Sequence, residues 1–213
     1  MLARRSVAKD PEMMTARHKS KRLQGALEPL REVTVTLCFT DIEQSSGLAQ
    51  AMGNRRWARL MQWHNDTIGA IVESHGGHVV KTLGDGTMIA FEATQPAAHA
   101  AIEIQRAMAA RRELPVIRLR VGIHIGDVIE TGGDYIGHAV NKAARIAAAA
   151  RGGQIMVSDA FSTMLSEAPE CLLGDIEVVK LKGLDGVHQV APLLYDAEGS
   201  SLSLVSRRGS SGP

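Results

Sequence analysis

Apolar and polar residues alternate in two segments of the chain, which is the pattern of half-buried β-strands. The first segment ends at Asp41, and its apolar residues Val33, Val35, Leu37 and Phe39 share one face. The second covers residues 116–125, with Ile117, Leu119, Val121 and Ile123 on one face and Arg118, Arg120 and His124 on the other. These two segments predict the central strands of a sheet.

Helical spacing and turn residues predict the elements around these strands. Asn54 is placed to cap a helix whose apolar stripe is Trp57, Leu60, Met61, Ile68 and Ile71, and Gly76-Gly77 ends it. A hairpin follows, with strands over residues 78–83 and 87–91 around the turn Gly84-Asp85-Gly86. We further expect helices from Thr94 and over residues 137–150, and short strands at 154–157, 177–182 and 187–190. This order predicts an α+β sandwich with a mainly antiparallel sheet.

Composition limits the classes of partner. The 213 residues include 45% hydrophobic residues, enough for one core, and a net charge of +1 gives no reason to expect nucleic acid. The two cysteines, Cys38 and Cys171, predict buried thiols and a reducing compartment. No apolar run reaches the roughly 20 residues of a membrane span, so we expect a cytoplasmic protein without an integral membrane segment. We expect a basic arm over 1–31, a catalytic domain over 32–196 and a disordered tail over 197–213.

Two carboxylates stand where the chain turns. Asp41 ends the first strand, and Asp85 lies in the hairpin turn. If the two strands are neighbours, both side chains reach the same end of the sheet, where they can hold hard divalent cations against a triphosphate. Taken alone, Asp85 is an ordinary hairpin residue and Asp41 an ordinary helix cap.

Four segments in order carry a resemblance to a known family. They are Phe39-Thr40-Asp41-Ile42, the run from Lys81 to Gly86, the run from Leu119 to His124 and the run from Asp134 to Arg145. Together they resemble the class III nucleotidyl cyclases over about residues 32–194, especially compact actinobacterial adenylyl cyclases. The fold implied is a ferredoxin-like, palm-type sandwich, a mainly antiparallel sheet covered by helices.

The resemblance implies a role for each matching residue. Asp41, Asp85 and the Ile42 carbonyl are expected to bind two divalent cations, Mg²⁺ or Mn²⁺. Arg145 matches the arginine that stabilises the transition state, and Asn141 matches the residue that orients the ribose. Two phosphate contacts are expected, from Arg120 and from Lys182, although the second alignment can slip to Lys180.

Lys81 and Asp134 match the pair that selects the base. A lysine donates to N1 of adenine and a carboxylate accepts from its N6 amino group, whereas guanine reverses both roles. The substrate expected is therefore ATP, converted to cyclic AMP and pyrophosphate. In the family, each active site lies between two catalytic domains. One domain supplies the metal aspartates, and the other supplies the base-selecting pair, the asparagine and the arginine. Because this chain matches both sets, the resemblance implies a homodimer with shared sites.

One departure and three alternatives accompany this hypothesis. Family members commonly have Gly-Ser-Thr where this chain has Gln44-Ser45-Ser46, which puts catalytic efficiency in question. A catalytically weak or inactive regulatory module of the same fold is the main alternative. A diguanylate-cyclase-like domain is suggested by Gly132-Gly133-Asp134, but the acidic-aromatic continuation is missing. A zinc site at His75 and His78 lacks further ligands nearby.

Overall fold

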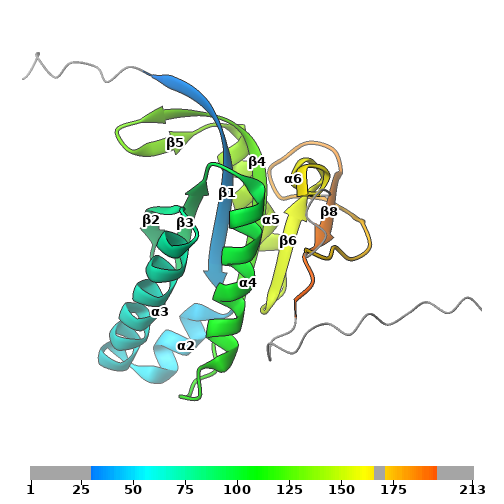
Figure 1. Cartoon of the computed structure of the whole chain (residues 1–213). Helices are drawn as coiled ribbons and strands as arrows, with labels where there is room; N and C mark the ends of the chain where they lie inside the picture. The colour runs from blue at the N-terminus through cyan, green and yellow to red at the C-terminus, as the bar shows by residue number, and fades with distance from the viewer. Residues whose placement is uncertain (1–29, 166–170, 196–213) are drawn as a thin grey trace, which may run out of the picture. The chain divides into compact units, whose positions relative to one another are not determined.

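The computed structural model describes residues 30–165 and 171–195, which form one sheet with helices on both faces (Figure 1). The elements in chain order are β1 (Arg31–Ile42), α2 (Ser45–Met52), α3 (Asn54–Ser74), β2 (His78–Leu83), β3 (Gly86–Phe91), α4 (Thr94–Ala110), β4 (Leu119–Thr131), β5 (Asp134–Ile136), α5 (His138–Ala149), β6 (Gln154–Ser158), α6 (Asp159–Leu165), β7 (Glu177–Val179) and β8 (His188–Pro192).

The sheet places β1 at its centre. The strand order is β2-β3-β1-β4-β6-β8-β7, and β5 pairs with the end of β4. All pairings are antiparallel except that of β4 with β6. The predicted α+β sandwich with a mainly antiparallel sheet is therefore confirmed.

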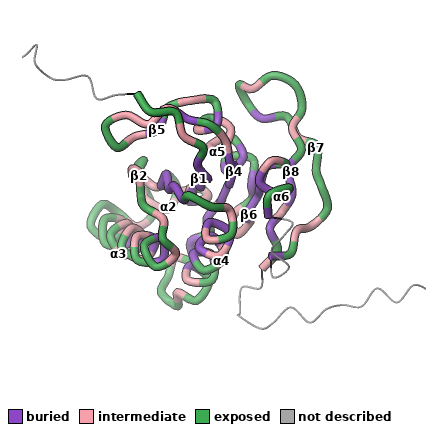
Figure 2. Tube along the Cα trace, turned by 45° about the horizontal axis from the view of Figure 1, so that its top comes forward, coloured by how far each residue is buried: buried purple, intermediate pink, exposed green. Residues whose placement is uncertain are grey.

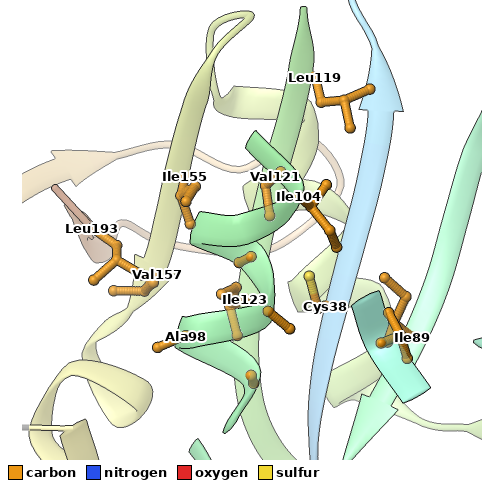
Figure 3. Packing of buried hydrophobic residues seen from close by; sticks show 14 of the residues in the cluster. Cys38, Ile89, Ala98, Ile104, Leu119, Val121, Ile123, Ile155, Val157 and Leu193 are labelled. Atoms are coloured by element: carbon orange, nitrogen blue, oxygen red, sulfur yellow. The ribbon is translucent and has the colours of Figure 1, made fainter. Parts of the chain in front are cut away.

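Each face of the sheet has its own core. On one face, Cys38 and Ile42 of β1 and alternate residues of β4 pack against α3, α4 and α6, as Figure 3 shows around Ile104 and Ile123. On the other face, Leu37 and Phe39 pack against the alanines of α5. Burial is therefore greatest along the central strands, while α3 exposes its outer turns (Figure 2). Cys38 and Cys171 are both buried, as expected.

The differences from the predicted elements are local. The helix α2, the helix α6 and the short strand β5 were not anticipated. Residue Asn54 begins α3 instead of capping it, because Gly53 occupies the cap and no side chain bonds there. The strand β4 starts at Leu119 and extends to Thr131, since its second half pairs with both β1 and β5. The strand expected over 177–182 ends at Val179.

Some expectations fall outside the described part of the chain. The basic arm predicted for 1–31 lies there apart from Leu30 and Arg31, and the tail predicted for 197–213 lies there entirely. Among the described residues, no helix has the length and apolarity needed to cross a bilayer.

Candidate active site

The end of β1 brings Asp41 against an arginine. The antiparallel register pairs Asp41 directly with Arg120 of β4, and the Arg120 guanidinium donates to the Asp41 carboxylate. Both side chains stay about one-third exposed, at 33% for Asp41 and 31% for Arg120. The two predicted site residues therefore share one corner of the sheet that solvent can reach.

The β2–β3 turn lies beside this corner. The ladder between β1 and β3 pairs Thr40 with Thr87, so the turn that carries Asp85 lies next to Asp41. The approach is close, because a Cβ on Gly86 would lie 2.7 Å from the Thr40 carbonyl oxygen. The tight turn inferred from Gly84-Asp85-Gly86 also needs Gly84, which has a φ of 73°. The structure thus brings the two predicted metal aspartates to adjacent strand ends.

These residues fit a hard divalent cation. Carboxylate and carbonyl oxygens are its preferred ligands, and Asp41, Asp85 and the Ile42 carbonyl supply them at one edge. In the free chain the Arg120 guanidinium occupies the Asp41 carboxylate, so a divalent cation would have to displace it there. In the described ranges, no three His, Cys, Asp or Glu residues gather to hold a metal ion. His75, considered above for a zinc site with His78, lies 2.8 Å from the Glu103 carboxylate.

Lys81 and Asp134, far apart in sequence, meet in space. The Lys81 amino group donates to both Asp134 carboxylate oxygens, at 2.7 and 2.6 Å. The contact forms because the β4–β5 hairpin reaches across to β2 (Figure 1). The hydrogen bond from Lys81 holds the pKa of Asp134 below its ordinary value, helped by the backbone N–H of Tyr135. The two side chains are 38% and 42% exposed, so both remain accessible to a ligand.

Asn141 and Arg145 lie on the outer face of α5. The opposite face of this helix carries the buried residues Ala139, Ala143 and Ala147. It lies so close to β4 that a side chain at Gly122 would collide with the Ala147 backbone. Asn141 and Arg145 therefore point away from the sheet of their own chain and are exposed, one turn apart.

Both lysines considered for the second phosphate contact lie in the β7–β8 loop. Lys180 and Lys182 are both exposed and line the same cavity of ≈ 450 Å³. Either one has room for a phosphate group, so the choice between them stays a prediction.

Three residues at the site were missed or only partly seen in the sequence. The Glu43 carboxylate accepts a hydrogen bond of 3.0 Å from the Gly152 N–H, which ties the segment after Asp41 to the loop that follows α5. The neighbouring Gln44 has a φ of 57° and is the one non-glycine residue with positive φ in the described chain. The contact of Glu43 with Gly152 leaves no periodic signal in the sequence. The left-handed backbone at position 44 had one sequence signal, because family members commonly have glycine there.

His64 is the third residue that sequence reasoning missed. It is fully buried on α3, and its Nε2 atom has no partner among the described residues. Burial lowers the pKa of His64, while the hydrogen bond with Asn65 and the charge of Asp85 act in the opposite direction. Its spacing from Leu60 and Ile68 placed it on the apolar stripe, where histidine is normally only a core residue.

Known proteins share this fold and sequence pattern. An adenylate/guanylate cyclase/hydrolase structure from Silicibacter pomeroyi is 30% identical, with a TM-score of 0.70 and coverage of 79% of this chain and 100% of that one. The adenylyl cyclase CyaB from P. aeruginosa has the same TM-score of 0.70 at 20% identity, covering 79% and 97%, and so supports the fold alone.

Curated relatives agree at the level of sequence. An uncharacterized protein of Mycobacterium tuberculosis is 31% identical over 72% of this chain and 39% of its own length. A putative adenylate cyclase 3 of Rhizobium meliloti is 34% identical over 63% of this chain and 24% of its own length. The chain thus spans less than half the length of these two relatives. The family described as "Adenylate and Guanylate cyclase catalytic domain" matches residues 27–191, and the chain belongs to this family.

Proposed function

We propose that the chain is an adenylyl cyclase that converts ATP to 3′,5′-cyclic AMP and pyrophosphate in a homodimer. The observation that carries the choice of ATP is the contact of Lys81 with both carboxylate oxygens of Asp134. A donor beside an acceptor, both accessible to solvent, matches the N1 and N6 groups of adenine. Guanine would set its N1–H against the lysine and its O6 against the carboxylate, which leaves both groups mismatched.

The residues around Asp41 support the cyclisation. The ribose 3′-oxygen attacks the α-phosphorus, a new P–O bond closes the cyclic ester, and the bond to pyrophosphate breaks as the hydroxyl proton leaves. Divalent cations held by Asp41, Asp85 and the Ile42 carbonyl would supply charge neutralisation and a lower pKa for that hydroxyl. Arg120, which donates to Asp41 in the free chain, would turn to the distal phosphates, with Lys182 as a second contact.

Asn141 and Arg145 would complete the site from a second chain. Arg145 would stabilise negative charge on the α-phosphoryl oxygens in the transition state, and Asn141 would orient the ribose. On their own chain both side chains face away from the sheet that carries Asp41, which supports a partner supplying them. A homodimer would hold two equivalent sites of this kind.

The test measures cyclic nucleotide formation by the purified chain with Mn²⁺, offering ATP and GTP separately. We expect cyclic AMP from ATP and at least about 100-fold slower turnover of GTP, because the mismatched base leaves polar groups unpaired. The variant Lys81→Glu with Asp134→Ser should reduce that preference to below about tenfold. A matched control, Arg31→Glu with Glu130→Ser, breaks another exposed ion pair with the same change in charge and should leave the preference intact. Comparable turnover of GTP by the unmodified chain would contradict the proposal.

A further inference from the structure

A separate cavity lies between α3 and the loop that joins α4 to β4. Its volume is ≈ 470 Å³, and none of its lining residues belongs to the candidate active site. Cavities that bind small molecules in proteins have volumes of about 300–1,000 Å³. The lining residues are Met52, Arg56, Arg59, Leu60, Trp63, Arg111, Arg112, Glu113 and Leu114. The cavity therefore has the size of a ligand site and a chemistry of its own.

The cavity combines an apolar wall with an excess of positive charge. Its apolar side chains are Met52, Leu60, Trp63 and Leu114. Four arginines face one carboxylate, that of Glu113, whose side chain is 84% exposed. Because this carboxylate is already bonded to Arg111, positive charge in the cavity is largely uncompensated.

One arginine is fixed in place before any ligand arrives. The Arg111 guanidinium lies 5.1 Å from the centre of the Trp63 ring and donates to the Pro115 carbonyl at 3.0 Å. It also donates to the Glu113 carboxylate at 3.0 Å, and its side chain is only 12% exposed. A cation held over an aromatic ring keeps its charge while losing little further freedom on binding.

The other three arginines have no such partners. Within the described ranges, Arg56, Arg59 and Arg112 form no ion pair or side-chain hydrogen bond. Arg56 and Arg59 are three residues apart on α3, so they share a face. Guanidinium groups bind carboxylate and phosphate through two parallel hydrogen bonds, which suits them to an anionic head group.

We propose that this cavity binds a small organic anion, with a phosphate or carboxylate group held by Arg56, Arg59 and Arg112 and an apolar body against Trp63 and Leu60. The free arginines match the head group, and the apolar wall matches the body. An inorganic anion would leave the apolar wall uncovered, and a neutral aromatic compound would leave the guanidinium groups unmatched.

The experiment follows the fluorescence of Trp63 in the full chain. Because the sequence has two tryptophans, Trp57→Phe makes Trp63 the single reporter. The probes are 1-naphthyl phosphate and 1-naphthoate, compared with neutral 1-naphthol and with inorganic phosphate. We expect saturable quenching by at least one naphthyl anion, and at least tenfold weaker binding of 1-naphthol and of inorganic phosphate. Phosphate and carboxylate are distinguished by which naphthyl anion binds more tightly.

Neighbouring arginines provide the matched control. Arg56→Gln removes a guanidinium that lines the cavity, whereas Arg55→Gln removes the adjacent exposed one that does not. We expect Arg56→Gln to weaken binding at least fivefold and Arg55→Gln to change it less than twofold, with both proteins folded by circular dichroism. Equal weakening by the two variants, or no saturable binding of either anion at millimolar concentration, would overturn the proposal. Unchanged affinity in Arg120→Gln separates this cavity from the candidate active site.

Discussion

The end of β1 and the outer face of α5 carry the two halves of the predicted chemistry, and the structure treats them differently. At the end of β1, Asp41 is paired with Arg120 in strand register, and the Asp85 turn packs beside it. On α5, the side chains of Asn141 and Arg145 are exposed and form no hydrogen bond or ion pair with any described residue. One half is assembled within the chain, and the other is presented outward.

This difference shows what each half depends on. The aspartates are set by backbone pairing, so they keep their positions in a single chain. The α5 residues are positioned only by the packing of the buried face of their helix, and their target must come from outside. Folding of one chain therefore builds the part of the site around Asp41 and Asp85, whereas we propose that association of two chains completes the part on α5.

The largest expected effect tests the half that the chain assembles by itself. The variant Asp85→Asn keeps the size of the side chain but removes the charge that a divalent cation needs. We expect cyclic AMP formation to fall by roughly 10³-fold, because charge on the reacting phosphate is no longer neutralised. The measurement is turnover at saturating ATP and Mn²⁺. Asp175→Asn, an exposed aspartate elsewhere, is the control and should retain full activity. Loss of less than about tenfold in Asp85→Asn would remove this residue from the metal site.

The second prediction tests the outward half. Arg145→Ala should lower turnover by roughly 10²–10³-fold, the usual cost of losing a group that stabilises transition-state charge. Mixing this chain in equal amounts with an inactive Asp41→Ala chain should restore activity toward about a quarter of the unmodified level. About half of the dimers are then mixed, and each mixed dimer has one of its two sites intact. The readout is cyclic AMP formation as a function of mixing ratio. Mixed samples that stay as inactive as their components, although dimers are detected, would mean that each site lies within one chain.

Periodicity and motif order predicted the sheet, its main helices and the candidate residues, because each rests on local signals. Alternation over 33–39 and the Gly84-Asp85-Gly86 turn are fixed by backbone geometry, and both are found in the structure. The contact of Glu43 with Gly152 spans 109 positions, and no local pattern encodes it. The helix α2 was missed for a related reason, since it buries no residue completely and so leaves a weak apolar stripe.

The third prediction concerns the support beneath α5. His124 of β4 is 7% exposed, and its Nδ1 atom lies 2.8 Å from the hydroxyl of Ser158, the last residue of β6. Burial lowers the pKa of His124 to about 4, with a further lowering by the charge of Lys142 and an opposing effect of Asp159. The unfolded chain therefore binds a proton at this site between pH 6.5 and about 4, and the folded chain does not.

Stability is thus fully present above pH 6.5 and is lost as the pH falls toward 4, by up to about 3 kcal/mol. The measurement is the free energy of unfolding in urea from pH 7 to pH 4. His124→Asn should make this dependence shallower, whereas His138→Asn, at an exposed position on α5, should leave it unchanged. An equal slope in the unmodified chain and in His124→Asn would assign the loss to other groups, among them His64, whose pKa is also lowered by burial.

The smallest expected effect lies in the loop after Asp41. Gln44 has a φ of 57° and a ψ of 30°, a left-handed conformation that costs a non-glycine residue roughly 1–2 kcal/mol. Gln44→Gly should therefore stabilise the fold by roughly 0.5–1 kcal/mol, after the greater flexibility of glycine in the unfolded chain is subtracted. Gln44→Ala is the matched control, because it shortens the side chain but keeps the conformational cost. We expect kcat/KM for ATP to rise a few-fold in the glycine variant alone, since backbone can then approach phosphate more closely.

If alanine raises kcat/KM as much as glycine does, the glutamine side chain limits the reaction and the backbone conformation does not. If glycine stabilises the chain without changing kcat/KM, the loop is strained but makes no contact with phosphate. The departure at position 44 would then affect folding alone, and the half of the site that is assembled within the chain would depend on Asp41, Asp85 and Arg120 without the backbone of this loop.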